Sequence, residues 1–158
     1  MSNGHAQQRP ATERLRSLGL DLPAVPADGK YVNHRRAGSN IHVAGQLPYA
    51  DGQLSALGIL GRDVEVATAR DLARQAALNA LAVAAEAMGG LDRVRIVQML
   101  VFVASTSEFG DQSRVADAAS ELLTEVLGEN GWHARTAIGV ASLPRNSPVE
   151  IQLICTAA

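Results

Sequence analysis

The segment from Arg93 to Ala104 constrains the fold more than any other part of the chain. Its side chains form two alternating sets, and Gln98 is the only interruption. Successive side chains of a β-strand point to opposite faces of a sheet, so a strand with two apolar sets is typically buried on both faces. We therefore expect a central strand that is covered on both sides. The sets are Val97, Met99, Val101 and Val103 on one face, and Ile96, Leu100 and Phe102 on the other.

One helix is predicted before this strand, over residues 65–88, and one after it, over residues 108–127. Apolar residues recur at helical spacing in both, and glycines follow them at Gly89, Gly90 and Gly128, where helices commonly end. Hydrophobic residues make up 47% of the chain but aromatic residues only 3%, so the core must consist of small and branched aliphatic side chains. The two stripes comprise Ala69, Leu72, Ala73, Ala76, Ala80, Val83, Ala84 and Ala87, and then Val115, Ala118, Ala119, Leu122, Leu123 and Val126.

The predicted order of elements is β-β-β-α-β-α-β-β. Residues 31–36 and 40–44 form a hairpin, a small strand lies around Gln53 and Leu54, and the last two strands span residues 135–142 and 149–156. This order predicts an α+β domain over residues 30–158, with one mixed sheet of roughly six strands and both helices on one face. Residues 1–29 are predicted to be an N-terminal extension with a short helix. The open face would expose apolar side chains of the central strand, which favours burial against other copies of the chain.

Composition and motifs exclude several classes of function. The net charge of −2 gives no basic field for nucleic acid or for an anionic membrane, and no apolar stretch approaches 18 residues. Cys155 is the only cysteine, and the sequence lacks phosphate-binding, dinucleotide-binding and nucleophile-elbow motifs. His34, His42 and His133 are dispersed, which does not favour a metal site. We expect a cytoplasmic protein without cofactor or metal.

Arg135 is the first candidate for a binding residue. On a strand it shares a face with Ala137, Gly139 and Ala141, whose small size leaves room beside the guanidinium group. A guanidinium group with free space can form two parallel hydrogen bonds with a carboxylate. The alternative interpretation is a structural salt bridge from Arg135 to an acidic residue.

Glu150 and Tyr31 are the other candidates. Glu150 lies in an otherwise apolar strand, where burial would raise its pKa towards the range of a general base. The alternative is that Glu150 only partners Arg135 across neighbouring strands. Tyr31 either packs in the core or places its hydroxyl group over a ligand. Ser107 is predicted to be a helix N-cap, ahead of Glu108.

Three blocks of the sequence together resemble the RidA family, which is also called YjgF-like or reactive intermediate deaminase. The resemblance covers about residues 30–156 and is most specific in the G-Q-x-P loop and in the A-R-[ST] strand that leads to L-P and V-E-I. The longer N-terminus is similar to a less characterised subgroup. The blocks are Tyr31 with Gly38 to Pro48; Asn79 with Val101 to Val103; and Ala134 to Thr136 with Leu143, Pro144 and Val149 to Ile151.

The resemblance implies a chorismate-mutase-like fold, assembled as a homotrimer with clefts between subunits. It also implies the hydrolysis of reactive enamines and imines, such as 2-aminoacrylate and 2-iminopropanoate, to 2-keto acids and ammonia without a cofactor. In this family the arginine at Arg135 binds the substrate carboxylate, the glutamate at Glu150 positions or activates water, and the tyrosine at Tyr31 lines the cleft. Gly45 and Ser107 also fall at positions of that pocket.

Two positions depart from the family pattern. Ala137 stands where the family commonly has cysteine, and Ala44 where it frequently has serine or threonine. Both changes remove polar groups from the expected pocket, which favours a larger, more apolar substrate or a binding role. The alternative function is therefore a non-catalytic trimeric module that binds small carboxylates or acts as a holdase.

Overall fold

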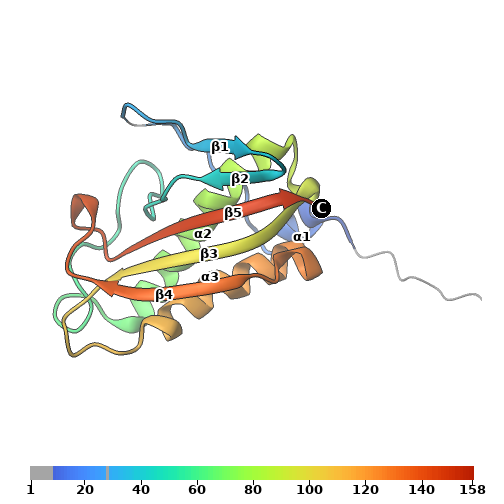
Figure 1. Cartoon of the computed structure of the whole chain (residues 1–158). Helices are drawn as coiled ribbons and strands as arrows, with labels where there is room; N and C mark the ends of the chain where they lie inside the picture. Colours follow the sequence, from blue (N-terminus) through green and yellow to red (C-terminus); the bar gives the residue numbers. More distant parts are fainter. Residues whose placement is uncertain (1–8, 28) are drawn as a thin grey trace, which may run out of the picture.

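A computed structural model describes residues 9–27 and 29–158. Five strands form one mixed sheet in the order β1-β2-β5-β3-β4, in which β3 and β4 are parallel and the other neighbours are antiparallel. The two long helices lie behind this sheet in Figure 1. The strands are β1 His34–Ala37, β2 Asn40–Val43, β3 Val94–Ala104, β4 Ala134–Val140 and β5 Val149–Ala157, and the helices are α1 Ala11–Ser17, α2 Val66–Met88 and α3 Gln112–Leu127.

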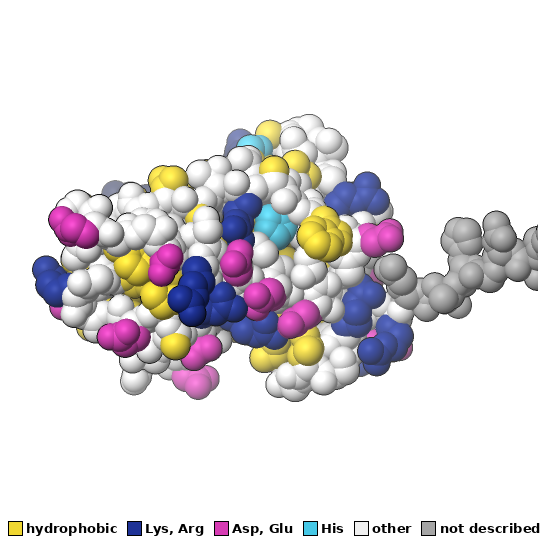
Figure 2. All heavy atoms as spheres, turned by 90° about the horizontal axis from the view of Figure 1, so that it is seen from below, with side chains coloured by type: hydrophobic (Ala, Val, Ile, Leu, Met, Phe, Trp, Pro, Cys, Tyr) yellow, Lys and Arg dark blue, Asp and Glu magenta, His cyan; other side chains and the backbone are white. Residues whose placement is uncertain are grey.

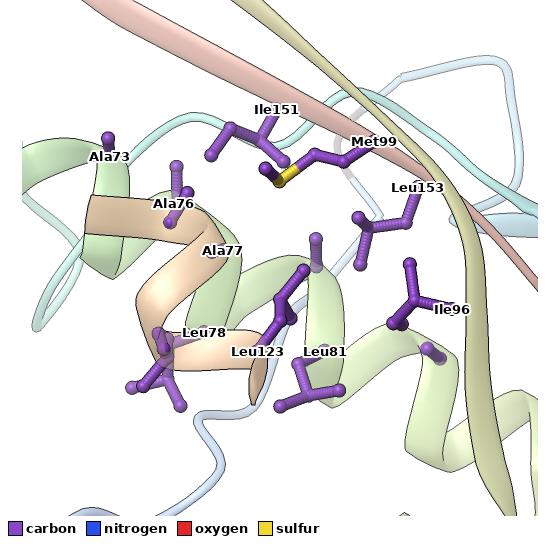
Figure 3. Close-up of a cluster of buried hydrophobic side chains, with 14 of the residues drawn as sticks. Ala73, Ala76, Ala77, Leu78, Leu81, Ile96, Met99, Leu123, Ile151 and Leu153 are labelled. Carbon is purple, nitrogen blue, oxygen red and sulfur yellow. The ribbon is translucent and has the colours of Figure 1, made fainter. Parts of the chain in front are cut away.

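The core lies between the sheet and the helices α2 and α3. Side chains of β3 and β5 point towards the alanine-rich face of α2, as Figure 3 shows for Met99, Ile151 and Leu153. Leu81 and Leu123 complete this layer from α2 and α3 and are fully buried. Because alanine has only a methyl group, α2 can approach the sheet closely, which explains how a chain with so few aromatic residues builds a packed core.

The predicted count of about six strands is wrong. Gln53 forms only an isolated bridge with Ala50 inside a turn, so the segment contributes no strand to the sheet. The turn uses positive φ angles at Asp51 and Gly52, of 50° and 75°, which an extended strand does not adopt. The strands β2, β3, β4 and β5 occur close to where the sequence predicts them, whereas β1 begins at His34 rather than at residue 31, so Tyr31 precedes the strand.

The fold contains three helices rather than the two expected for the domain, because the short helix predicted in the N-terminal extension, α1, packs against it. Leu15 is 4% exposed and belongs to the core cluster, and Arg14 Nε donates a hydrogen bond to the carbonyl oxygen of Val126, 2.6 Å away, at the end of α3. Thr12 binds Asp92 through both its backbone N–H and its hydroxyl group. These contacts fix α1 against the end of α3 and against the turn that precedes β3.

The start of α3 differs from the prediction as well. The helix begins at Gln112 rather than near residue 108, and Ser107 is not its N-cap. The Ser107 hydroxyl group instead donates a hydrogen bond to the neighbouring Glu108 carboxylate at 2.6 Å. Ser107 and Glu108 therefore lie in a local turn, closed by the hydrogen bond from the Phe109 N–H to the Thr106 carbonyl oxygen, and not in the first turn of a helix.

The side of the sheet away from the helices carries a mixed surface. Phe102 lies between Glu150 of β5 and Ile138 of β4 in the ladder, and Leu100 lies between Gln152 and Thr136. Ile138 is 42% exposed, and Leu100 and Phe102 are half-buried. Leu100 and Phe102, the uncovered set of β3, therefore lack a covering layer within one chain. The predicted sets are wrong at the start of the strand, where a register shift between Ile96 and Gln98 places Ile96 in the core and leaves Val97 42% exposed.

Candidate functional site

Arg135 lies on the helix side of the edge strand β4. Its ladder partner is Met99, a fully buried core residue, and Ala137 is paired with Val101 on the same side. Arg135 Nη1 donates to Asp117 Oδ1 at 2.8 Å and to Ser120 Oγ at 3.2 Å, both on α3. The salt bridge considered from the sequence is therefore formed, and its acidic partner is Asp117.

Glu150 lies on the opposite face of the sheet. Its ladder partner Phe102 belongs to the uncovered set of β3, and β3 separates the strands of Glu150 and Arg135. The alternative in which Glu150 partners Arg135 across neighbouring strands is therefore wrong for one chain. Glu150 is half-buried, and burial raises the pKa of its carboxyl group above the ordinary value.

The loop after β2 touches the Glu150 carboxylate. A Cβ atom at position 45 would lie 2.9 Å from Glu150 Cδ and nearer still to Oε1, so any other residue would displace the carboxylate from this position. Gln46 and Ile151 exchange two backbone hydrogen bonds, of 2.7 and 3.0 Å, which hold this loop against β5. Gly45 and Glu150 therefore lie side by side. Ala44 directly precedes Gly45 in the loop after β2.

Asn79 of α2 fixes the same loop from the helix side. It is 4% exposed, and its Nδ2 donates to the carbonyl oxygens of Leu47 at 2.9 Å and Tyr49 at 3.0 Å. Gln75 Nε2 donates to Asn79 Oδ1 at 2.9 Å. A buried amide with all these partners determines where Gly45 lies relative to Glu150.

Replacing Asn79 with alanine is expected to reduce the free energy of unfolding by about 2–3 kcal/mol, because two loop carbonyl groups lose a buried donor. Gln75→Ala is the matched control, since Gln75 is half-buried and supports the network only from its edge. Urea denaturation followed by circular dichroism measures both variants. A smaller loss in Asn79→Ala than in Gln75→Ala would contradict this role.

Tyr31 and Ser107 are less directly connected to these groups. Tyr31 is 55% exposed and precedes β1, and its segment is joined to the loop by the hydrogen bond from the Ala44 N–H to the Asn33 carbonyl oxygen. Ser107 is exposed in the segment that follows β3, where its hydroxyl group binds Glu108. The structure brings neither side chain into contact with Arg135 within one chain.

Sequence reasoning missed the partners of Arg135 on α3. His133 Nδ1 lies 2.6 Å from the Gly131 carbonyl oxygen, which can only accept a hydrogen bond, so Nδ1 carries the proton. Burial and the Arg135 charge lower the pKa of His133, so the ring is neutral near pH 7 and its Nε2 accepts from the Ser120 hydroxyl group at 3.0 Å. One signal in the sequence could have identified Asp117 and Ser120 as partners of Arg135: they are three residues apart, which places them on the same face of a helix.

The chain matches one known protein family over most of its length. The sequence profile of the family described as "YjgF/chorismate_mutase-like, putative endoribonuclease" matches residues 12–156. The chain belongs to this family. The chorismate-mutase-like α+β fold expected from the resemblance is therefore confirmed, with five strands and three helices.

Similar proteins come from distant organisms. Protein TCP17 of Trypanosoma cruzi is 42% identical over 143 residues, which cover 89% of each protein. A solved structure of a protein of unknown function from Agrobacterium tumefaciens is 42% identical, with a TM-score of 0.86 and coverage of 94% of this chain and 92% of the other. A Shewanella oneidensis structure, described as a "putative endoribonuclease", is 33% identical, with a TM-score of 0.89 and coverage of 93% and 99%.

Proposed function

We propose that the chain forms a homotrimer and hydrolyses reactive enamines and imines of the 2-aminoacrylate and 2-iminopropanoate type to 2-keto acids and ammonia. The reaction would take place in the cytoplasm and would need no cofactor. The observation that carries this proposal is the placement of Arg135 and Glu150 on opposite faces of one sheet. A single site that uses both side chains therefore requires two copies of the chain.

The uncovered face of the sheet supports assembly. Glu150, Phe102 and Ile138 lie in one row across three strands, and apolar side chains in that row remain accessible to solvent. A second copy that covered this face would bury them and bring the edge strand β4 of one chain near Glu150 of another. Such burial would also provide the water-poor surroundings in which charges act strongly.

The proposed chemistry is a simple addition and elimination. The enamine gains a proton at carbon and becomes the imine, water adds to the C2 atom of the imine, and the resulting carbinolamine expels ammonia to leave a 2-keto acid. Arg135 would bind the carboxylate, while Glu150 would take a proton from the attacking water and return it to the departing nitrogen. An imine already reacts with water without a catalyst. Holding the imine beside an oriented water molecule is therefore sufficient to accelerate its hydrolysis.

A carboxylate-binding module without catalysis is the second candidate. Arg135 already has a carboxylate partner in Asp117, and Ala44 and Ala137 contribute methyl groups in place of hydroxyl or thiol groups. The net charge of −2 gives less support to RNA cleavage, the activity named in the descriptions of the family and of some relatives. No helix in the described part of the chain is long and apolar enough to cross a bilayer.

The test combines an assembly measurement with a turnover assay. Imino acids are generated in place by an amino acid oxidase with catalase, and ammonia and keto acid release is followed with and without the protein. Light scattering on the same sample measures the mass of the particle. A trimer that accelerates release supports the proposal, tight keto acid binding without acceleration supports the second candidate, and a monomer contradicts both.

A further inference from the structure

A surface pocket of about 370 Å³ lies between α3 and the start of β4. Figure 2 views the molecule from this side and shows Arg, acidic and His side chains gathered in a band across it. Two salt bridges between α2 and α3, Arg70 with Glu121 and Arg74 with Glu125, lie on the helices beside the pocket. The pocket is lined by Asp117, Ser120, Glu121, Thr124, Trp132, His133 and Arg135.

Arg135 presents one edge of its guanidinium group to α3 and keeps the other available. Asp117 and Ser120 both bind Nη1, and among the described residues no hydrogen bond to Nη2 or Nε is found. Ser120 is in turn held by the neutral ring of His133. This chain of hydrogen bonds fixes the plane of the guanidinium group, so its free edge can receive a carboxylate without a search through rotamers.

Trp132 forms an apolar wall of the same pocket. It is 72% exposed, although it is the only tryptophan in a chain with 3% aromatic residues. A side chain of this size is ordinarily buried, and an exposed indole ring beside a fixed arginine is well suited to stack against an apolar group of a ligand.

We propose, building on the deaminase function above, that the preferred substrates are 2-imino acids with a bulky aliphatic or aromatic side chain. The carboxylate binds the free edge of Arg135, and the side chain lies against Trp132. Pyruvate-sized ligands leave the indole uncovered and bind less tightly.

The test measures binding of three product acids by calorimetry: pyruvate, 4-methyl-2-oxopentanoate and phenylpyruvate. We expect the two larger acids to bind about tenfold more tightly than pyruvate, as expected for one aromatic contact. In Trp132→Ala this preference disappears while pyruvate affinity is unchanged, and Trp132→Phe keeps most of it. In the unmodified protein, fluorescence of the single tryptophan changes with the larger acids and hardly with pyruvate.

Equal affinity for all three acids, or a preference that survives in Trp132→Ala, would overturn the substrate assignment and leave the deaminase proposal intact. A second result would also overturn the substrate assignment: Trp132→Ala changes the particle mass measured by light scattering but leaves the order of the three affinities unchanged. Trp132 would then contact another copy of the chain and not the ligand. Failure of the deaminase proposal is separately recognised, because no imino acid of any size would release ammonia faster in the presence of the protein.

Discussion

Arg135→Ala is expected to lower kcat/KM for imino acid hydrolysis by about 10²–10³-fold, because the substrate carboxylate loses its charged, two-pronged partner. Keto acid binding, measured by calorimetry, should weaken by a similar factor. The fold should survive. The pair of Arg135 with Asp117, whose side chains are 24% and 51% exposed, contributes only about 0.2–1 kcal/mol to stability, as surface pairs do.

Arg135→Lys is the matched control, because it keeps the charge and loses the planar fork. It should retain more keto acid affinity than Arg135→Ala and less than the unmodified protein. If Arg135→Ala binds keto acids as tightly as the unmodified protein, Arg135 is only a structural partner of Asp117. If its activity falls only in proportion to an unfolded fraction, the same conclusion holds.

Glu150→Gln is expected to lower kcat by about 10²-fold, because the amide group keeps the shape of the side chain but cannot accept a proton from water. The unmodified enzyme should lose activity as the pH falls through the raised pKa of Glu150, at a pH above the usual range of glutamate. Glu150→Gln should lack this acid limb. A pH profile of kcat/KM that is identical in both proteins would contradict the assignment.

Glu150→Gln, which is expected to lower activity, is not expected to lower stability. Burial raises the pKa of Glu150 in the folded state, so the contribution of this group to stability is fully present below its unfolded pKa and is lost as the pH rises through the folded value. At neutral pH the ionised carboxylate is therefore a cost, and Glu150→Gln should unfold at an equal or higher urea concentration. A variant that is less active and no less stable separates a functional role from a structural one.

The secondary structure was largely predictable because it rests on local periodicity. The stripes of α2 and α3 and the apolar alternation of β3 each repeat over enough residues to determine the element. The register shift that buries Ile96 and exposes Val97 could not be predicted, because both residues are apolar. The segment around Gln53 is too short to show a periodic pattern. It forms a turn because Asp51 and Gly52 adopt positive φ angles. The start of α3 was misplaced because the Ser107 hydroxyl group binds the Glu108 side chain, a choice that the sequence pattern does not reveal.

The candidate residues were easier to find than their arrangement. Arg135 and Glu150 stand out because each is a charged residue in an apolar strand. Their separation onto two faces depends on β5 inserting between β2 and β3 with its own register, which is a long-range property of the sheet. The spacing of Asp117 and Ser120 was too weak a signal to assign them to Arg135, since an acidic residue on an amphipathic helix is ordinarily solvent-exposed.

The most direct test of a site shared between two copies is complementation between Arg135→Ala and Glu150→Gln. The two inactive chains are mixed in equal amounts, unfolded and reassembled together. A site is intact when one chain supplies Arg135 and its neighbour supplies Glu150, so we predict recovery of about a quarter of the unmodified activity. If the mixture is no more active than the two variants assembled separately, Arg135 and Glu150 do not act together across an interface between two copies of the chain.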